Sequence, residues 1–240
     1  MTAYLRLEVL RTLRSPAFVM FTIAFPVAFY LLFTTLFQMR PVQNTDFDAY
    51  YMVSMALYGS MSICMMGIGG RIAIERTRGW TRQLALLPLR PSAYISVKLA
   101  SATLLTVPVI GLIMICGRFI NDVNLPFGIW VALAPTIWLA ALPFVALGIA
   151  IGYVFRDEVA QIASMTLYFV LSLLGGLWMP VIVFPDWLET IGKLMPTYRA
   201  AEPSWLILSD QSPLTWGLLI LLGWTGLFAA LAVWRYRRIG

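Results

Sequence analysis

The amino-acid sequence predicts an all-α polytopic membrane protein with six transmembrane helices. Of its 240 residues, 60% are hydrophobic and 12% are charged, with a mean hydropathy of +0.83, whereas roughly 25% of the residues of a soluble domain are charged. The charges are clustered, which leaves apolar stretches of about 20 residues, enough for a helix to cross the hydrocarbon core of a bilayer. A soluble domain, a disordered chain and a nucleic-acid-binding protein are therefore excluded. Cys64 and Cys116 both lie inside apolar stretches, which excludes a disulfide scaffold as well.

Six apolar segments reach the spanning length, and we expect one membrane span in each. They cover residues 17–37, 50–70, 94–117, 126–154, 160–182 and 214–234, so that residues 1–240 form a single transmembrane domain. A secretory signal peptide is the competing interpretation of the first segment. Its 21 apolar residues exceed the roughly 7 to 15 of such signals, and no small-residue cleavage site follows it. We interpret it as a retained span.

A short amphipathic helix is expected before the first span. Apolar residues project to one side of it and charged residues to the other: Leu5, Val9, Leu10 and Leu13 against Glu8, Arg11 and Arg14. This pattern suits a helix lying in the membrane interface, with its arginines near anionic headgroups. A plain positively charged flank is the alternative interpretation.

The distribution of basic residues predicts the orientation of the chain. With a cytoplasmic N-terminus, 13 of the 17 Lys and Arg residues lie on the cytoplasmic side: Arg6, Arg11, Arg14, Arg71, Arg76, Arg78, Arg82, Arg90, Lys98, Arg156, Arg235, Arg237 and Arg238. Arg40, Arg118, Lys193 and Arg199 are left outside. Because Lys and Arg are retained in cytoplasmic loops, we expect a multi-pass protein of the inner or plasma membrane with both termini in the cytoplasm.

The connection of residues 71–93 is predicted to be cytoplasmic and amphipathic. Between Thr77 and Leu87, an apolar face at i, i+4 and i+7 consists of Trp80, Leu84 and Leu87. Pro88 and Pro91 follow and end the helix. Two interpretations remain open, an interfacial helix held only by lipid and a docking element for a cytoplasmic protein.

The outer connection of residues 183–213 is too apolar for a hydrophilic loop. Leu188, Ile191, Leu194 and Met195 are spaced helically, and residues 205–208 are apolar enough to enter the interface. We expect one or two short re-entrant helices, which requires that protein cover their broken backbone hydrogen bonding.

The absent residue types narrow the function further. The chain contains no histidine and no glycine-rich phosphate loop, so we expect no catalytic, cofactor-binding or metal site in it. The spans hold no acidic residue well inside the membrane, and their only basic residue is Lys98, near a cytoplasmic end. Ion-coupled carriers generally keep ionisable groups at mid-membrane, so such a carrier is disfavoured, and a passive pore lined by hydroxyls stays open.

Short motifs along nearly the whole chain resemble the permease subunits of ABC type-2 transporters. They are residues 74–84 (IERTRGWTRQL) and 87–91 (LPLRP), 156–160 (RDEVA), 171–176 (LSLLGG) with Pro180, 185–188 (PDWL) and 195–198 (MPTY). The amphipathic N-terminal helix belongs to the same pattern. The order and spacing of these motifs carry the resemblance, since each alone is weak.

The resemblance implies an exporter subunit that moves an amphiphilic or hydrophobic substrate, such as a drug, an antibiotic or a lipid-like molecule. Two permeases, identical or different, would form the transmembrane dimer within membrane lipid, above two copies of an ATP-binding subunit that holds ATP and Mg and hydrolyses the ATP. The coupling helix would lie between spans two and three, with Glu75, Arg76, Arg78, Gly79, Trp80, Leu84 and Leu87 as its contact residues.

The resemblance also places the first and fifth spans at the dimer seam. The polar residues of those spans are then candidates for the seam or the path: Thr22, Thr34, Thr35, Ser164, Thr166, Tyr168 and Ser172. The competing interpretation is that such hydroxyls bond their own backbone. The main alternative function is an ATP-independent pore or assembly factor. A lipid-modifying enzyme is the other, with Asp186, Glu189, Glu202 and Asp210 as its only candidates.

Overall fold

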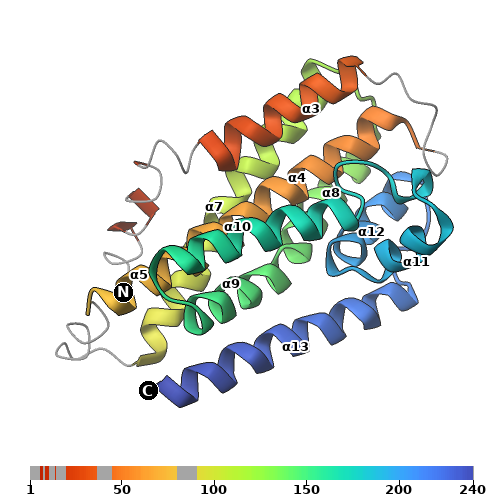
Figure 1. Cartoon of the computed structure of the whole chain (residues 1–240). Coiled ribbons are helices and arrows are strands. Elements are labelled where there is room, and N and C mark those ends of the chain that lie inside the picture. The colour runs from red at the N-terminus through yellow and green to blue at the C-terminus, as the bar shows by residue number, and fades with distance from the viewer. Residues whose placement is uncertain are drawn as a thin grey trace.

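The computed structural model describes residues 6–7, 9–10, 14, 20–36, 45–79 and 91–239, and these form helices without a β-strand. Figure 1 shows the long helices lying side by side along a common direction, with α3 along one edge and α13 along the other. The elements are η1 (Met20–Ala24), α3 (Phe25–Leu36), α4 (Phe47–Met65), η2 (Met66–Gly70), α5 (Arg71–Thr77), α7 (Pro91–Phe119), α8 (Phe127–Ala140), α9 (Leu142–Val154), α10 (Asp157–Leu174), η3 (Val181–Val183), α11 (Asp186–Leu194), α12 (Pro196–Leu208) and α13 (Trp216–Ile239).

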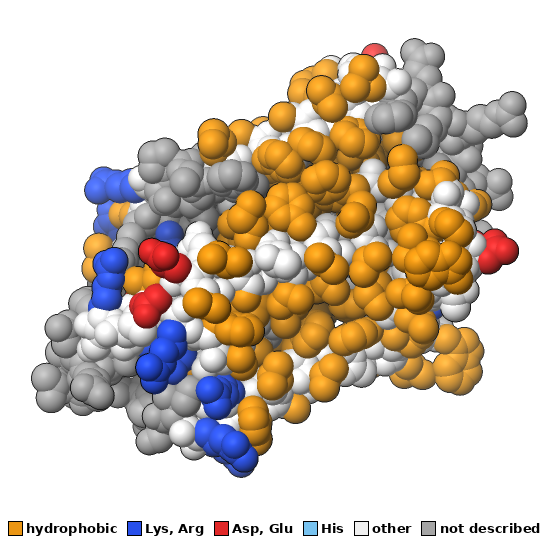
Figure 2. All heavy atoms as spheres, viewed as in Figure 1, with side chains coloured by type: hydrophobic (Ala, Val, Ile, Leu, Met, Phe, Trp, Pro, Cys, Tyr) orange, Lys and Arg blue, Asp and Glu red, His pale blue; other side chains and the backbone are white. Residues whose placement is uncertain are grey.

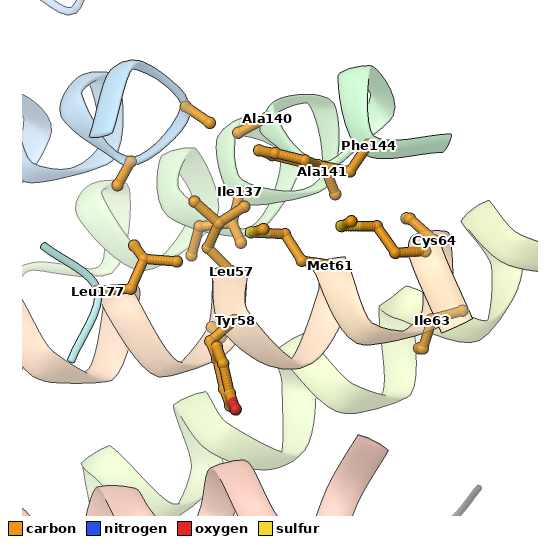
Figure 3. Packing of buried hydrophobic residues seen from close by; sticks show 14 of the residues in the cluster. Leu57, Tyr58, Met61, Ile63, Cys64, Ile137, Ala140, Ala141, Phe144 and Leu177 are labelled. Atoms are coloured by element: carbon orange, nitrogen blue, oxygen red, sulfur yellow. The ribbon is translucent and has the colours of Figure 1, made fainter. Parts of the chain in front are cut away.

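The helix α4 is the centre of the bundle. All of its residues except Asp48 are buried, because α3, α7, α8, α9, α10 and α12 all pack against it. Protein therefore surrounds α4 on every side. In Figure 3, Leu57 and Met61 of α4 lie against Ile137 and Ala141 at the α8–α9 junction.

The helix α4 continues through the π-helical turn η2 into α5, which gives one helix of 31 residues, Phe47–Thr77. Two glycines of α9, Gly148 and Gly152, lie in close contact with this helix. A Cβ added at Gly148 would lie 2.2 Å from the carbonyl oxygen of Cys64, and one added at Gly152 would lie 2.9 Å from that of Gly69. Gly148 and Gly152 therefore allow α9 to pack closely against the helix of residues 47–77 within the same chain.

Among the described residues, five helices are long and apolar enough to cross a membrane: Phe47–Thr77, Ser96–Phe119, Phe127–Val154, Asp157–Leu174 and Trp216–Arg238. They correspond to the second to sixth predicted spans. The first predicted span appears as the shorter apolar helix Thr22–Leu36, so the count of six remains a prediction. The fourth span is interrupted at Ala141, just before Pro143, whose ring nitrogen carries no hydrogen to donate.

The predicted end of the fifth span was wrong. The helix α10 ends at Leu174 rather than Ile182, because Gly176 takes the left-handed conformation with φ +77° and Pro180 follows it. Side chains other than glycine adopt this backbone conformation rarely. The chain leaves the helix here and continues through η3.

The connection of residues 183–213 forms two short helices, α11 and α12, as expected from its sequence. Protein covers α12, which packs against α4, α8 and α13. Its Trp205 is buried and stacks on Tyr50 of α4, with ring centroids 4.5 Å apart. The depth of these helices in a bilayer stays a prediction.

Charged side chains mark one end of the bundle. We call it the basic end, where α5 ends at Thr77, α7 begins at Pro91 and α13 ends at Ile239. Figure 2 shows Lys and Arg side chains gathered there, while apolar side chains cover the middle of this face. Of the expected amphipathic N-terminal helix, Arg6, Leu7, Val9 and Leu10 are helical, and the other residues named for it are outside the described part, apart from Arg14, which lies in a turn.

Candidate functional site

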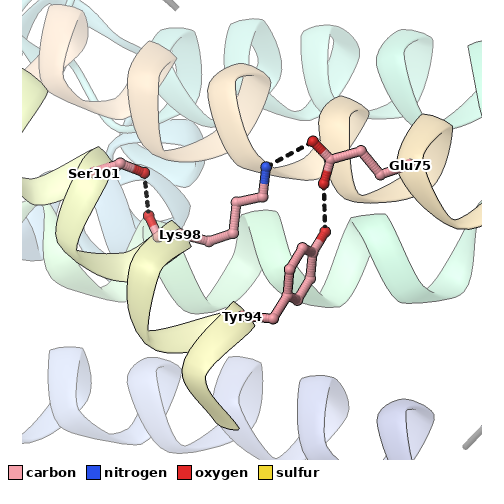
Figure 4. A network of polar contacts seen from close by, with 4 residues as sticks. All are labelled: Glu75, Tyr94, Lys98 and Ser101. Atoms are coloured by element: carbon pink, nitrogen blue, oxygen red, sulfur yellow. Dashed lines mark hydrogen bonds and ion pairs between the residues drawn. The ribbon is translucent and has the colours of Figure 1, made fainter. Parts of the chain in front are cut away.

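A buried ion pair joins the helices on either side of the predicted docking segment. The ammonium of Lys98 on α7 lies 2.9 Å from Oε1 of Glu75 on α5, and the hydroxyl of Tyr94 donates a hydrogen bond of 2.7 Å to Oε2. Lys98 is 1% exposed and Glu75 6%. Figure 4 shows both groups of α7 reaching the same carboxylate. We call Glu75, Tyr94 and Lys98 the buried clasp.

The clasp follows from helix geometry and burial. Tyr94 and Lys98 are four residues apart and therefore lie on one face of α7. A buried charge requires a partner of opposite sign, and Glu75 supplies it for Lys98. The sequence analysis noted that Lys98 was the only basic residue in a span, but it did not pair Lys98 with Glu75.

The expected exposed position of Glu75 is corrected by this geometry. Glu75 belongs to the helix that continues from α4, and its carboxylate points into the bundle rather than toward a docking protein. Its side chain is buried, so Glu75 is not a solvated surface charge. If Glu75 takes part in coupling, it does so by linking α5 to α7 and not by contacting a partner protein.

Arg76 makes a second connection from α5 to the bundle. Its Nη1 donates a hydrogen bond of 2.6 Å to the carbonyl oxygen of Gly152, and its guanidinium lies 5.1 Å from the ring centroid of Tyr153. Both partners belong to α9. The end of α5 is thus fixed to α7 through Glu75 and to α9 through Arg76.

The helix expected from Thr77 to Leu87 does not begin at Thr77, because α5 ends there. Arg78 is exposed, and Gly79 is left-handed with φ +73°. Of the other predicted contact residues, Trp80, Leu84 and Leu87 lie outside the described residues. Their helical, amphipathic character remains a prediction.

A cluster of aromatic rings connects α3, α4, α10 and the segment after α10. Ring centroids lie 4.2 Å apart for Phe25 and Phe29, 5.1 Å for Phe29 and Trp178, and 4.4 Å for Tyr58 and Tyr168. Tyr58 also meets Trp178 edge-on at 5.7 Å. We call these five residues the aromatic cluster. The cluster was not predicted from the sequence, although the spacing of Phe25 and Phe29 at i, i+4 indicated an aromatic face.

The structure buries most of the polar residues proposed for the seam or path. Thr22, Thr34, Ser164, Tyr168 and Ser172 are buried within the chain, whereas Thr35 and Thr166 are exposed. The hydroxyls of Thr34 and Thr35 bond carbonyl oxygens of their own helix, as the competing interpretation of these residues has it. The hydroxyl of Tyr168 donates instead to the carbonyl oxygen of Tyr58 on α4, at 3.2 Å. Of these seven residues, only Thr35 and Thr166 are exposed, so they are the two that a second subunit could contact.

Known proteins support the resemblance. A model of the family described as ABC-2 type transporter matches residues 1–208. The chain belongs to the ABC-2 type transporter family. It is also 33% identical over 231 residues to a Bacillus subtilis (strain 168) protein named "Putative transport permease YvfS", and the match covers 96% of this chain and 94% of that protein.

Membership in the ABC-2 family makes this chain a membrane permease subunit and implies an ABC ATP-binding partner in general. The matched region contains the buried clasp, the aromatic cluster and the whole connection of residues 78–90. It also contains no group of three or more potential metal-ligating side chains among the described residues. The features available to this ABC-2 permease are therefore the internal bonds that join α5 to α7 and α9 at the basic end, and an apolar, aromatic interior.

Proposed function

We propose that the chain is the transmembrane subunit of an ATP-driven ABC exporter of the plasma membrane. In this proposal, two permeases form a homodimer or a heterodimer, and two ATP-binding subunits lie against the basic end on the cytoplasmic side. ATP and Mg are held by those partner subunits. The observation that carries the proposal is the ABC-2 family match over residues 1–208.

Coupling would pass through the connection of residues 78–90. The partner would press on its apolar face at Trp80, Leu84 and Leu87, with arginines making charge-assisted contacts at the rim. The connection begins at α5 and ends at α7, and the clasp joins these two helices behind it. A push on the connection would therefore move α5 and α7 together, and α9 with them through Arg76.

An amphiphilic or hydrophobic substrate fits the interior best. The aromatic cluster offers ring faces without a formal charge, and the described parts of α3, α8 and α9 contain no Asp, Glu, Lys or Arg. Aromatic rings bind apolar groups by burial and stacking. Outward movement toward α11 and α12 would follow from ATP use on the cytoplasmic side. The seam would lie along the exposed faces of α3 and α10, where Thr35 and Thr166 are placed.

Copurification tests the proposal most directly. The chain is extracted from its native membrane in mild detergent, and associated proteins are examined for an ATP-binding-cassette subunit. We expect wild type to retain that subunit and the L84D variant to lose it, because a carboxylate would enter the apolar docking face. L214D is the matched control, since Leu214 is 80% exposed just before α13, at the end opposite the basic end. An unaccompanied wild-type chain would favour an ATP-independent pore or assembly factor.

ATP-dependent transport provides the second readout. Inverted vesicles that contain the complex should accumulate a fluorescent amphiphile only with hydrolysable ATP, since export from a cell corresponds to uptake into an inverted vesicle. Uptake into right-side-out vesicles would reverse the proposed direction. Equal uptake without ATP would contradict the ATP-driven mechanism.

A further inference from the structure

Three arginines from different parts of the sequence lie on segments that contact one another at the basic end. Arg76 lies on α5, Arg156 precedes α10 and Arg235 lies in the last turns of α13. Two tyrosines hold this arrangement together. Arg76 lies over the ring of Tyr153, and Tyr153 meets Tyr236 of α13 edge-on, with ring centroids 5.4 Å apart.

The positive charges of this cluster are not neutralised within the described residues. Thr77, next to Arg76, donates a hydrogen bond to Asp157, next to Arg156, and Tyr153 beneath Arg76 contacts Tyr236, next to Arg235. None of the three forms an ion pair with a described carboxylate. Nε of Arg235 is buried without a hydrogen-bond partner. Guanidinium groups gathered in this way favour binding of an anion that neutralises them.

The nearby acidic residues do not supply that anion. Asp157 accepts a hydrogen bond from the hydroxyl of Thr77, which directs one of its carboxylate oxygens to α5. Glu158 is exposed on the first turn of α10 and is not ion-paired to a described arginine. The cluster therefore keeps a net positive charge at the surface of the bundle.

The surroundings of the cluster are those of a membrane interface. Val233 and Leu231 on α13 are 50% and 38% exposed, and α13 packs mainly against α9 on its other side. Trp234 is 49% exposed and lies 4.3 Å beneath the guanidinium of Arg238. Tryptophan and tyrosine concentrate at the headgroup level of membranes, and Figure 2 shows basic side chains next to apolar ones at this end.

We propose that Arg76, Arg156 and Arg235 form a binding site for the phosphate of an anionic phospholipid. The headgroup phosphate lies among the three guanidinium groups, and an acyl chain follows the exposed apolar face of α13 past Val233 and Leu231. Basic pockets between transmembrane helices on the cytoplasmic side bind anionic headgroups in this way. The site does not depend on what the protein transports.

A lipid fits this site better than an acidic segment of a partner protein. Arg76 is half-buried between helices, bonded to Gly152 on α9, and does not project from the end of the bundle. The apolar surface beside the arginines continues along α13 in the direction of the membrane. A protein partner would use the guanidinium groups but would leave that surface uncovered.

The test compares lipid binding by the full-length protein, with any copurifying subunit, in mixed micelles. The probe is fluorescent phosphatidylglycerol, competed by unlabelled phosphatidylglycerol or by phosphatidylcholine. We expect the R156Q/R235Q variant to bind phosphatidylglycerol about thirty-fold more weakly than wild type, because each basic residue near a membrane surface contributes roughly a fivefold change. R156K/R235K should keep most of the affinity. Arg76 is left intact because its bond to Gly152 supports the fold.

The matched control is R237Q. Arg237 has the same charge and lies in the same turn of α13. Because residues two positions apart lie on nearly opposite sides of a helix, its side chain points away from Arg235. R237Q should bind phosphatidylglycerol like wild type, and melting in pure detergent should be the same for all variants. Equal loss in R237Q and in R156Q/R235Q would reduce the effect to general surface charge and overturn the proposal.

Two further outcomes would also overturn it. If millimolar inorganic phosphate displaces the labelled lipid completely, the cluster binds free phosphate rather than a lipid headgroup. Loss of a copurifying subunit in R156Q/R235Q, with unchanged lipid binding, would assign the arginines to a protein contact. Failure of the transport assay would leave the lipid measurement unaffected, so the two proposals can fail separately.

Discussion

Lys98 and Glu75 form a salt bridge of 2.9 Å in which both side chains are almost completely buried. The two residues are 23 positions apart in the sequence, one before and one after the connection that is proposed to contact the ATP-binding partner. Tyr94 occupies the second carboxylate oxygen. These contacts link α5 and α7, which flank the connection, so that the two helices are expected to move together.

Removing one partner of the clasp should destabilise the protein strongly. K98M or E75Q breaks the buried ion pair by removing one of its charges, which costs about 3 to 5 kcal/mol of unfolding free energy. The double variant E75Q/K98M should recover a large part of that loss. Thermal melting in detergent measures all three. K193M is the control, because its pair with Glu189 is exposed and should contribute less than about 1 kcal/mol. Similar melting of K98M and K193M would contradict the buried clasp.

The contact of α9 with α4 should not tolerate a methyl group. In G148A, the new Cβ would lie 2.2 Å from the carbonyl oxygen of Cys64, so the helices must separate. We expect a loss of about 1 to 3 kcal/mol in unfolding free energy. G223A is the matched control, because a Cβ at Gly223 on α13 meets no atom within 4 Å. Its helix should be unchanged or more stable. A melting temperature for G148A at or above that of G223A would rule out this close contact.

The backbone at Gly79 should influence coupling. Its φ of +73° favours glycine, whereas the space around it is open, so a substitution acts through backbone strain alone. We expect G79V to strain the start of the docking connection by roughly 1 to 2 kcal/mol and to lower transport per ATP hydrolysed. G79N should keep more activity, since asparagine tolerates the left-handed region better. If G79V and wild type transport the same amount of substrate per ATP hydrolysed, Gly79 does not take part in coupling.

The proposed orientation can be tested by labelling single cysteines in intact cells. Membrane-impermeant reagent should reach D46C, N121C and D186C but not T77C or R238C. Asp46, Asp186, Thr77 and Arg238 are exposed and Asn121 half-buried, so the difference would report sidedness and not burial. The native Cys64 and Cys116 are buried and should give little background. External labelling of T77C would reverse the orientation and remove the basis for docking at residues 78–90.

The proposed seam predicts which face of α10 crosslinks between subunits. Cysteines at Ile162, Thr166 and Leu173 should crosslink, because these residues are exposed and are spaced by about one and two helical turns along the same face. Ser164 and Tyr168 should not, since they are buried within the chain. Leu104 on α7 is 53% exposed and serves as an exposed control outside the seam. Crosslinks at position 104 with none along α10 would mean that the subunits meet elsewhere.

The regular parts of the fold could be predicted from local properties of the sequence. The length of apolar stretches marked α4, α7, α8 with α9, α10 and α13, and the helical spacing of apolar residues marked α11. The end of α10 was missed because apolar residues continue to Ile182. Gly176 at φ +77° ends the helix through a backbone conformation, which hydropathy does not measure.

The candidate site was only partly predictable for a related reason. Amphipathic spacing identified the connection after Thr77, and short motifs identified the family. Burial of Glu75 was missed because the residue lies in a polar stretch of sequence. Its partner Lys98 becomes close only when α5 and α7 pack together.

The sequence by itself determined that this chain is a helical membrane protein of the ABC-2 type, since composition, apolar length and motif order are properties of the chain read along its length. Tertiary structure alone decided the clasp between Glu75 and Lys98, the contact of Arg76 with Tyr153 and the burial of Ser164 and Ser172. These depend on which helix faces meet. Because almost every face of such a protein is apolar, hydropathy does not distinguish a helix side that faces lipid from one that faces protein. Steric fit at glycines and the pairing of the few buried charges make that distinction.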